Sequence, residues 1–144
     1  MRAASGFHWT RVDNHIPQAQ DAIRDALADV VTKAVLDIQG DAISQAPVVT
    51  GRLKTSIQAV TPTSDWEQVI AGGVGTNVEY AAYVELGTGQ AGAGSAYPYP
   101  RQARYTMSWA GMTARAMIGN AAKRVEPSFL AVLARLQDRL PGKV

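Results

Sequence analysis

The pattern of apolar positions predicts a long helix near the N-terminus. Between Pro17 and Pro47 the apolar residues recur at intervals of three and four, which places them on one face of a helix. Proline is tolerated in the first turn of a helix and ends one at its far side, so we expect a helix over residues 17–45, with Gly40 as a weak point. The apolar stripe consists of Ile23, Leu27, Val30, Val31, Ala34, Val35 and Ile38.

The apolar spacing changes to two after a turn-rich stretch that ends at Gly51. Apolar and polar residues alternate over residues 53–59, which predicts a half-buried strand. A turn at 62–65 leads into a second predicted strand over 66–74. We expect these two strands to pair as an antiparallel hairpin.

Three further elements follow the hairpin. Asn77 is suited to cap a helix and Gly87 to end one, so we expect a short helix over residues 78–86. Alternation over residues 105–109 predicts a third strand. Helical spacing over residues 118–140 predicts a last helix, which a proline inside it is expected to kink or divide.

This order of elements predicts an α+β fold, in which a long N-terminal helix and a C-terminal helix pack on a small antiparallel sheet. With 144 residues the chain is interpreted as one domain over residues 17–144, preceded by a flexible arm over 1–16. Residues 87–100 hold four glycines and a Tyr-Pro-Tyr-Pro run, and are expected to form an extended loop.

Charge is distributed unevenly along the chain, although the net charge is only +2. Residues 17–46 carry a net charge of −3, whereas residues 97–144 carry +6. Solvated surface charge explains any single residue, but the asymmetry also suits an acidic surface of one copy that meets a basic surface of the next. The basic residues that are candidates to face DNA or a partner are Arg101, Arg104, Arg115, Lys123 and Arg124. No recognition-helix or stacking pattern organises them, so only non-specific DNA contact is left open.

The residues that most catalytic sites require are scarce. The absence of cysteine excludes disulfides, thiol catalysis and cysteine-based metal sites. The two histidines, His8 and His15, lie in the predicted arm, where no scaffold would hold a catalytic base. The glycine-rich run at 72–76 lacks the Lys-Ser/Thr of a phosphate-binding loop. We predict no enzyme, no metal and no cofactor; a hydrolase with an unrecognised site is the alternative from the enzyme class.

Targeting and membrane-spanning patterns are missing as well. The first residues lack the apolar region of a signal peptide, and no run of about 18 apolar residues occurs. We expect a soluble protein that is made in a cytoplasm and has no membrane partner.

Two blocks of the sequence resemble a family of tailed-phage proteins. Residues 46–57, A-P-V-V-T-G-R-L-K-T-S-I, are similar to the family pattern A-P-x-x-T-G-x-L-x-x-S-I. Residues 74–88, V-G-T-N-V-E-Y-A-A-Y-V-E-L-G-T, are similar to V-G-(S/T)-x-x-x-Y-A-x-Y-V-E-(F/L)-G-T. A weaker third block covers 111–121, where Ala116 and Met117 replace the proline and phenylalanine of the family. The family comprises the small tail-completion or head–tail joining (neck) proteins of long-tailed phages and prophages.

The resemblance implies an α+β subunit without enzymatic activity, which forms a ring at the head–tail junction of the virion and is assembled in the host cytoplasm. A hexamer is expected, with a dodecamer as the alternative. The implied partners are copies of the chain itself, a head-completion or connector protein, a tail terminator or tail tube protein, and the passing genomic DNA, bound non-specifically. The nearest alternative function is a tail terminator that caps the tail tube; a non-specific DNA-binding module is less favoured.

The resemblance also indicates which positions belong to the subunit interface or to a structural motif. These are Thr50, Gly51, Arg52, Leu53, Ser56, Tyr80, Tyr83, Glu85, Gly87 and Thr88. Arg52 and Glu85 are hypothesised to pair within or between subunits, and two unrelated surface charges are the alternative. Tyr80 and Tyr83 are expected to pack the short helix onto the sheet rather than bind a ligand, although tyrosine is also favoured at interfaces.

Overall fold

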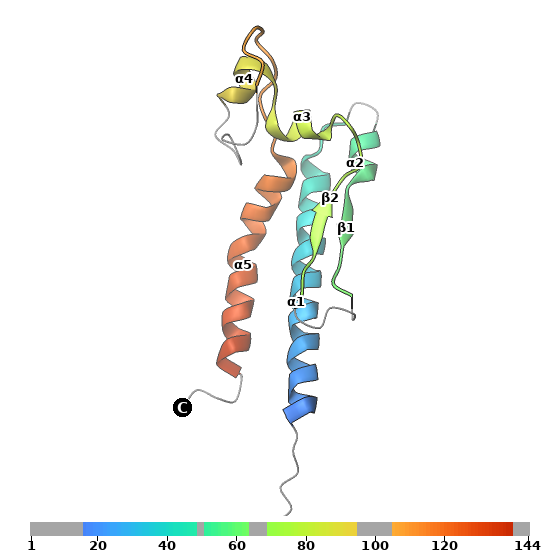
Figure 1. Ribbon diagram of the computed structural model, residues 1–144, viewed down its shortest axis with the longest axis vertical. Helices are drawn as coiled ribbons and strands as arrows, with labels where there is room; N and C mark the ends of the chain where they lie inside the picture. Colours follow the sequence, from blue (N-terminus) through green and yellow to red (C-terminus); the bar gives the residue numbers. More distant parts are fainter. Residues whose placement is uncertain (1–15, 49–50, 64–68, 95–104, 140–144) are drawn as a thin grey trace, which may run out of the picture.

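Two long antiparallel helices, α1 (Ile16–Gln45) and α5 (Met117–Arg139), lie side by side and give the molecule its length (Figure 1). A small hairpin packs against α1, and two short helices lie across the end of the pair where α5 begins. The α+β class predicted from the sequence is confirmed. The computed structural model describes residues 16–48, 51–63, 69–94 and 105–139.

The long N-terminal helix is confirmed almost to the residue. α1 begins at Ile16 and runs without interruption through Gly40, so the glycine does not divide it. Of the predicted arm, residues 1–15 lie outside the described residues. The C-terminal helix α5 contains Pro127 and is not divided there, so one of the two predicted outcomes for that proline is wrong.

The predicted hairpin exists, but its strands are shorter than expected. β1 (Gln58–Val60) pairs antiparallel with β2 (Gly73–Gly75), with Ala59 opposite Val74. Residues 69–72 of the second predicted strand are not in the ladder, and residues 64–68 lie outside the described part of the chain.

Most of the first predicted strand is instead a helix, α2 (Arg52–Ser56). Gly51 before it adopts a left-handed backbone with φ +75°, which turns the chain into the helix. The hydroxyl of Thr55 then donates to the carbonyl oxygen of Gly51, and that of Ser56 donates to the carbonyl oxygen of Leu53 at 2.8 Å. These local bonds close a helical turn, which the alternation of apolar residues concealed.

The short helix after the hairpin is α3 (Ala81–Leu86), and it begins three residues later than predicted. Tyr80 precedes it and no side chain caps it, so the predicted cap at Asn77 is wrong. Thr76 supplies the local bond instead, because its hydroxyl oxygen accepts the N–H of Val78 at 3.2 Å. Gly87 ends the helix as predicted, with φ +77°.

Part of the predicted extended loop is also helical. Gly89–Ala93 form α4, whereas residues 95–100 lie outside the described residues. The third predicted strand, over 105–109, is absent from the structure as described; the segment contains a turn and no ladder. Its backbone wraps over α4, because the N–H of Gln90 donates to the carbonyl oxygen of Trp109 and the N–H of Ala91 to that of Ala110. Beyond it, Met112 makes an isolated bridge to Thr88.

The core lies at the end of the helix pair that is covered by α2, the hairpin and α3. Ile57 and Met117 are its largest fully buried side chains. The other members of this cluster are Ala42, Ala46, Leu53, Val78, Ala81 and Ala121. The half of α1 before Val35 contributes no residue to this cluster, although the apolar stripe continues through it.

Candidate assembly surfaces

A joint between α3 and α5 is built around Glu85. Its carboxylate accepts the backbone N–H of Ile118 at 3.1 Å and that of Gly119 at 2.8 Å. These N–H groups belong to the first turn of α5, where no carbonyl within the helix can accept them and where the helix dipole favours a negative charge. Glu85 therefore has a role within the subunit, as an N-terminal cap supplied from another helix. Its predicted pairing with Arg52 stays a prediction.

The two residues after α3 extend this joint. The backbone of Thr88 exchanges two hydrogen bonds with Met112, at 2.7 and 3.0 Å. A Cβ on Gly87 would lie 2.5 Å from the carbonyl oxygen of Met112 and 2.6 Å from the nitrogen of Ala114, so the close approach requires glycine. The hydroxyl of Tyr105 donates to the carbonyl oxygen of Leu86 at 2.9 Å. The end of α3 thus fixes the chain that leads into α5.

A second joint connects α2 with the chain between β2 and α3. The hydroxyls of Ser56 and Thr76 lie 2.6 Å apart, and Leu53 of α2 is buried, with 2% of its surface exposed. Gly51, Leu53 and Ser56 therefore serve the fold of this corner, Arg52 is exposed, and Thr50 lies outside the described residues. This joint involves other residues than the joint of Glu85, although both belong to the blocks that resemble the phage family.

The two tyrosines of the second block do not pack α3 onto the sheet, so that expectation is wrong. Tyr80 is 39% exposed and Tyr83 is 61% exposed. Because α3 begins at Ala81 rather than at Val78, its buried face carries Ala81, with Val84 against the core, and both tyrosines turn outward.

Tyr83 belongs to an exposed apolar area at the end of the molecule where α3 and α4 lie. It lines a shallow hollow together with Tyr105 and Trp109. Trp109 is 54% exposed and the nearby Met107 is 58% exposed. We call Tyr83, Met107 and Trp109 the aromatic patch; side chains of this kind are enriched at protein interfaces.

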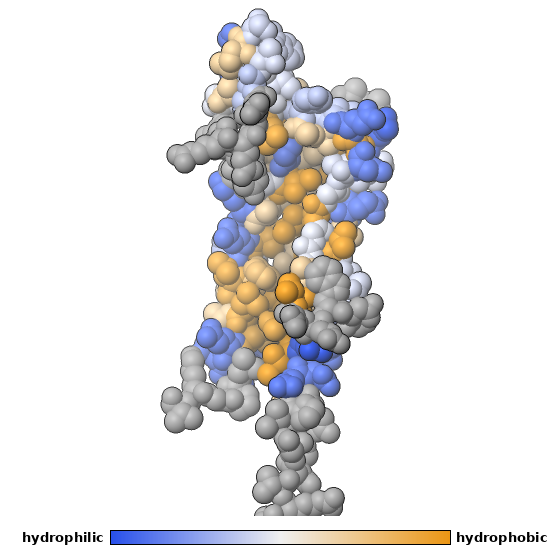
Figure 2. All heavy atoms as spheres, in the orientation of Figure 1, coloured by the Kyte–Doolittle hydropathy of each residue, from blue (hydrophilic) through white to orange (hydrophobic). Residues whose placement is uncertain are grey.

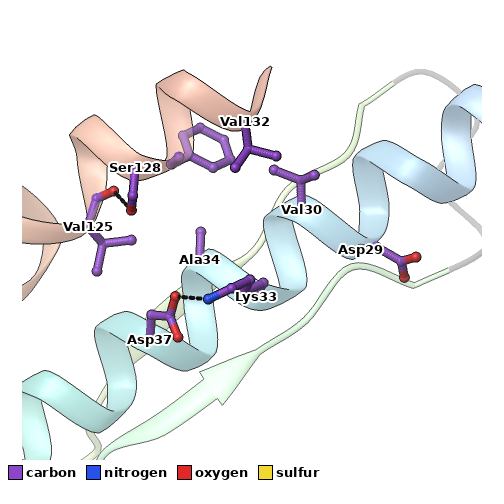
Figure 3. A pocket seen from close by; sticks show the side chains of 9 residues that line it. Asp29, Val30, Lys33, Ala34, Asp37, Val125, Ser128 and Val132 are labelled. Atoms are coloured by element: carbon purple, nitrogen blue, oxygen red, sulfur yellow. Dashed lines mark hydrogen bonds and ion pairs between the residues drawn. The ribbon is translucent and has the colours of Figure 1, made fainter. Parts of the chain in front are cut away.

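A longer apolar surface lies between the halves of α1 and α5 that are remote from the core. One hollow of about 240 Å³ is lined by Val30 and Ala34 of α1 and by Phe129 and Val132 of α5. Val30 and Val132 point toward each other across it, and Ala34 points into it from below (Figure 3). Figure 2 shows the apolar atoms gathered along this half of the helix pair.

A second hollow of about 350 Å³ continues this surface toward the start of α1. Small side chains of α1, among them Ala22 and Ala26, line one wall, and Leu136 of α5 lines the other. We call the two hollows together the helix groove. The sequence does not reveal this groove, because the apolar stripes of both helices predict that α1 and α5 contact each other but not that the contact is incomplete.

Charged residues border the groove on α1. Asp29 and Asp37 line the first hollow, and Asp37 forms an ion pair with Lys33 on the same helix (Figure 3). Nearer the core, the guanidinium of Arg124 on α5 donates to Asp41 on α1 at 2.9 Å. The second carboxylate oxygen of Asp41 is buried without a hydrogen-bond partner.

Of the predicted basic residues, the structure describes Arg115, Lys123 and Arg124. Arg115 is exposed ahead of α5, whereas Lys123 and Arg124 lie in the second turn of that helix. The contact with Asp41 gives Arg124 a role between the helices. Arg101 and Arg104 lie outside the described residues.

The described residues also bear on metal binding and on membrane insertion. No group of three or more histidine, cysteine, aspartate or glutamate side chains there is arranged to hold a metal ion. No described helix has the length and apolar character needed to cross a bilayer. His8 and His15 are outside the part of the chain that these findings concern.

Broad apolar areas at the surface beside a small core are typical of a protein that binds other chains. Comparison with protein families supports this class: the HK97-gp10-like family, described as "Bacteriophage HK97-gp10, putative tail-component", matches residues 11–87. This is more than half of the chain, and the chain belongs to that family. The match includes nearly all of the two blocks that carry the resemblance. No curated protein and no solved structure matches the chain.

Proposed function

We propose that the chain is a structural subunit of a ring at the head–tail junction of a long-tailed phage, where it joins the connector to the tail tube and lets DNA pass. Membership of a phage tail-component family supports a structural role in the tail. The observation that carries the ring is the large apolar surface that a single subunit leaves exposed.

Large apolar side chains are exposed at the surface of the subunit as well as buried in its small core. Ile57 and Met117 are the largest fully buried side chains of the described residues, whereas Tyr83 and Trp109 of the aromatic patch are more than half exposed and Val132 of the groove is 37% exposed. Soluble monomers rarely expose large contiguous apolar patches, because water does not solvate them favourably. The helix groove and the aromatic patch are therefore expected to be covered by other chains in the virion.

Unequal charges on the two long helices favour contacts between unlike surfaces. α1 carries five aspartates and two basic residues, whereas α5 carries four basic residues and two acidic ones. A contact between two different surfaces of identical subunits propagates from head to tail and closes into a ring when the rotation fits. We propose a hexamer, with a dodecamer as the alternative.

Passage of DNA requires a channel wall that does not trap the duplex. Arg115 and Lys123 are exposed, so either can contribute to a weak, non-specific attraction for phosphate. This contact would position the ring around DNA without reading sequence.

The ring can be tested on the purified chain. We expect light scattering coupled to size-exclusion chromatography to give a single closed oligomer, either alone or after addition of connector and tail tube proteins, and electron microscopy to show a central hole. A monomer at every concentration, with and without those partners, would refute the ring.

A test of the position of the chain in the virion requires a phage that lacks this chain. A joining protein is expected to leave filled heads and separate tails of normal length, because each part is completed before they meet. A tail terminator would instead leave tails of uncontrolled length, because nothing stops polymerisation of the tube. Measurement of tail lengths by electron microscopy therefore separates the two functions.

A further inference from the structure

The two long helices are packed tightly together only at the end of the molecule that contains the core. Met117 and Ala121 of α5 are fully buried, whereas none of residues 122–139 is buried. In α1, none of residues 19–34 is buried either. These halves of the two helices contact each other through partly covered side chains that line the helix groove. Because such contacts hold the helices less firmly than the core does, this half of the pair separates at a lower cost in free energy.

The hairpin supports α1 along this half, so α5 is the less firmly held of the two helices. A Cβ at Gly72 would lie 2.7 Å from a side-chain carbon of Val35, so the chain before β2 lies directly on α1. Nearer the start of α1, Pro62 and Ile70 line a hollow together with Asp25. α5 packs against α1 and α3, and α3 lies at its start (Figure 1).

The first turns of α5 are fixed by bonds from outside the helix. Glu85 of α3 accepts the N–H of Gly119 at 2.8 Å, and Arg124 donates to Asp41 of α1 at 2.9 Å. All of these bonds lie before Pro127 in the sequence of α5. A movement of the part of α5 that follows this proline therefore leaves them intact.

The backbone of α5 is weakened at Pro127. Proline has no N–H, so the carbonyl oxygen of Lys123 receives no bond from position 127. At the next position, the hydroxyl of Ser128 donates to the carbonyl oxygen of Val125 at 2.8 Å, which is the oxygen that a regular helix offers to the N–H of Phe129. Both features favour bending of a helix, and here they are adjacent.

We propose that residues 128–139 of α5 form an arm that swings on Pro127 toward and away from α1, while the first turns of α5 stay fixed on the core. The arm stays helical as it moves, because the fixed part of α5 serves as its helical nucleus. Its movement widens and narrows the helix groove, so the apolar area that the subunit exposes depends on the position of the arm. An arm of this kind does not require the proposed ring.

Distances between spin labels test the arm directly, because the chain has no cysteine of its own. One pair of labels is placed on Asp25→Cys, which faces the hairpin, and on Ala134→Cys in the arm. Ala134 is exposed and lies roughly 160° around α5 from Val132, so its label points away from the groove. The matched pair combines Asp25→Cys with Glu126→Cys, an exposed position just before Pro127. We expect the distance distribution of the arm pair to be at least about twice as wide as that of the matched pair.

A restored backbone bond at the pivot should hold the arm in one position. Pro127 is exposed, so Pro127→Ala should preserve the fold, and the added N–H can donate to the carbonyl oxygen of Lys123. We expect Pro127→Ala to narrow the distribution of the arm pair to that of the matched pair, and to slow amide hydrogen exchange over residues 128–139 at least about tenfold. Arg135→Ala is the control: it is an exposed substitution within the arm that restores no backbone bond, and it should change neither measurement.

The results distinguish a swinging arm from a rigid helix and from a helix end that melts. Equal widths for the two label pairs would show that the arm does not move separately from the rest of α5. A wide distribution for the arm pair that Pro127→Ala leaves unchanged would show that Pro127 is not the pivot. Coil-like NMR chemical shifts over residues 128–139 would show that this segment unfolds rather than swings. Each of these three results overturns the proposal, whereas helical shifts together with a wide distribution that narrows in Pro127→Ala confirm it.

Discussion

Glu85 on α3 holds Gly119 at the start of α5, with 2.8 Å between its carboxylate oxygen and the backbone nitrogen. The same carboxylate also accepts the N–H of Ile118. The backbone carbonyl oxygen of Glu85 accepts a third bond, from the N–H of Ala116 at 3.0 Å. Together these bonds fix where α5 begins relative to α3. They also fix the position of the α5 wall of the helix groove.

Removal of the Glu85 carboxylate should therefore loosen the start of α5. We expect Glu85→Ala to lower the free energy of unfolding by about 1.5–3 kcal/mol, because two backbone N–H groups lose a charged acceptor. Glu85→Gln keeps a hydrogen-bond acceptor but has no charge, so its free energy of unfolding should lie between those of the natural chain and Glu85→Ala. Urea unfolding followed by far-UV circular dichroism measures the loss. Glu79→Ala is the control: Glu79 is exposed just ahead of α3, and its loss should change stability by less than about 0.5 kcal/mol.

Substitution of Gly87 tests the close approach of its backbone to Met112, beside the joint between α3 and α5. Any side chain there must adopt φ +77° and place its Cβ 2.5 Å from the carbonyl oxygen of Met112. We expect Gly87→Ala to destabilise the subunit by about 3 kcal/mol or more, since backbone must move as well. Gly73→Ala is the matched substitution, because a Cβ at Gly73 meets nothing within 4 Å. Equal unfolding midpoints for the two variants would contradict this account of the joint.

The sequence predicts the long elements of this fold better than the short ones. The apolar stripe of α1 extends over many turns, so its period identifies a helix without ambiguity. The alternation over residues 53–59 predicts a strand, but α2 covers residues 52–56, where the local hydroxyl bonds of Thr55 and Ser56 favour a helical turn. Alternation over so few residues does not distinguish a strand from a helical turn.

The sequence predicts the assembly surfaces only where the signal is local. Gly87 can be identified as a helix end, because the conformational reason for a glycine at that position is local. The bonds from Glu85 to Ile118 and Gly119 join residues more than thirty positions apart, and no local pattern marks them. The helix groove likewise depends on how much of α1 and α5 the other elements cover, which is a property of the tertiary structure.

Ala116, in the linker just before α5, has an unusual backbone that can be tested by substitution. It is buried and has φ +45°, and its N–H is bonded to Glu85. Proline fixes φ near −65° and has no N–H, so we expect Ala116→Pro to cost at least about 3 kcal/mol of stability. Ala116→Gly accepts the positive φ but loses a buried methyl group, and should stay within about 1 kcal/mol of the natural chain. Chemical denaturation of both variants measures the difference, and a proline variant as stable as the glycine variant would show that this backbone conformation is wrong.

The ion pair of Asp41 and Arg124 links α1 to α5 and should contribute modestly to stability. Arg124 is 59% exposed while Asp41 is 24% exposed, so water and salt screen much of the attraction. A double-mutant cycle with Asp41→Ala and Arg124→Ala should give a coupling energy of about 0.5–1 kcal/mol that decreases in 1 M salt. The same double-mutant cycle on Lys33 and Asp37, an exposed pair within α1, should give a smaller coupling energy. Because Asp41 has a buried oxygen without a partner, Asp41→Ala alone should cost less than the loss of a fully satisfied carboxylate. A coupling energy of zero would mean that the register of the two helices is set by apolar packing alone.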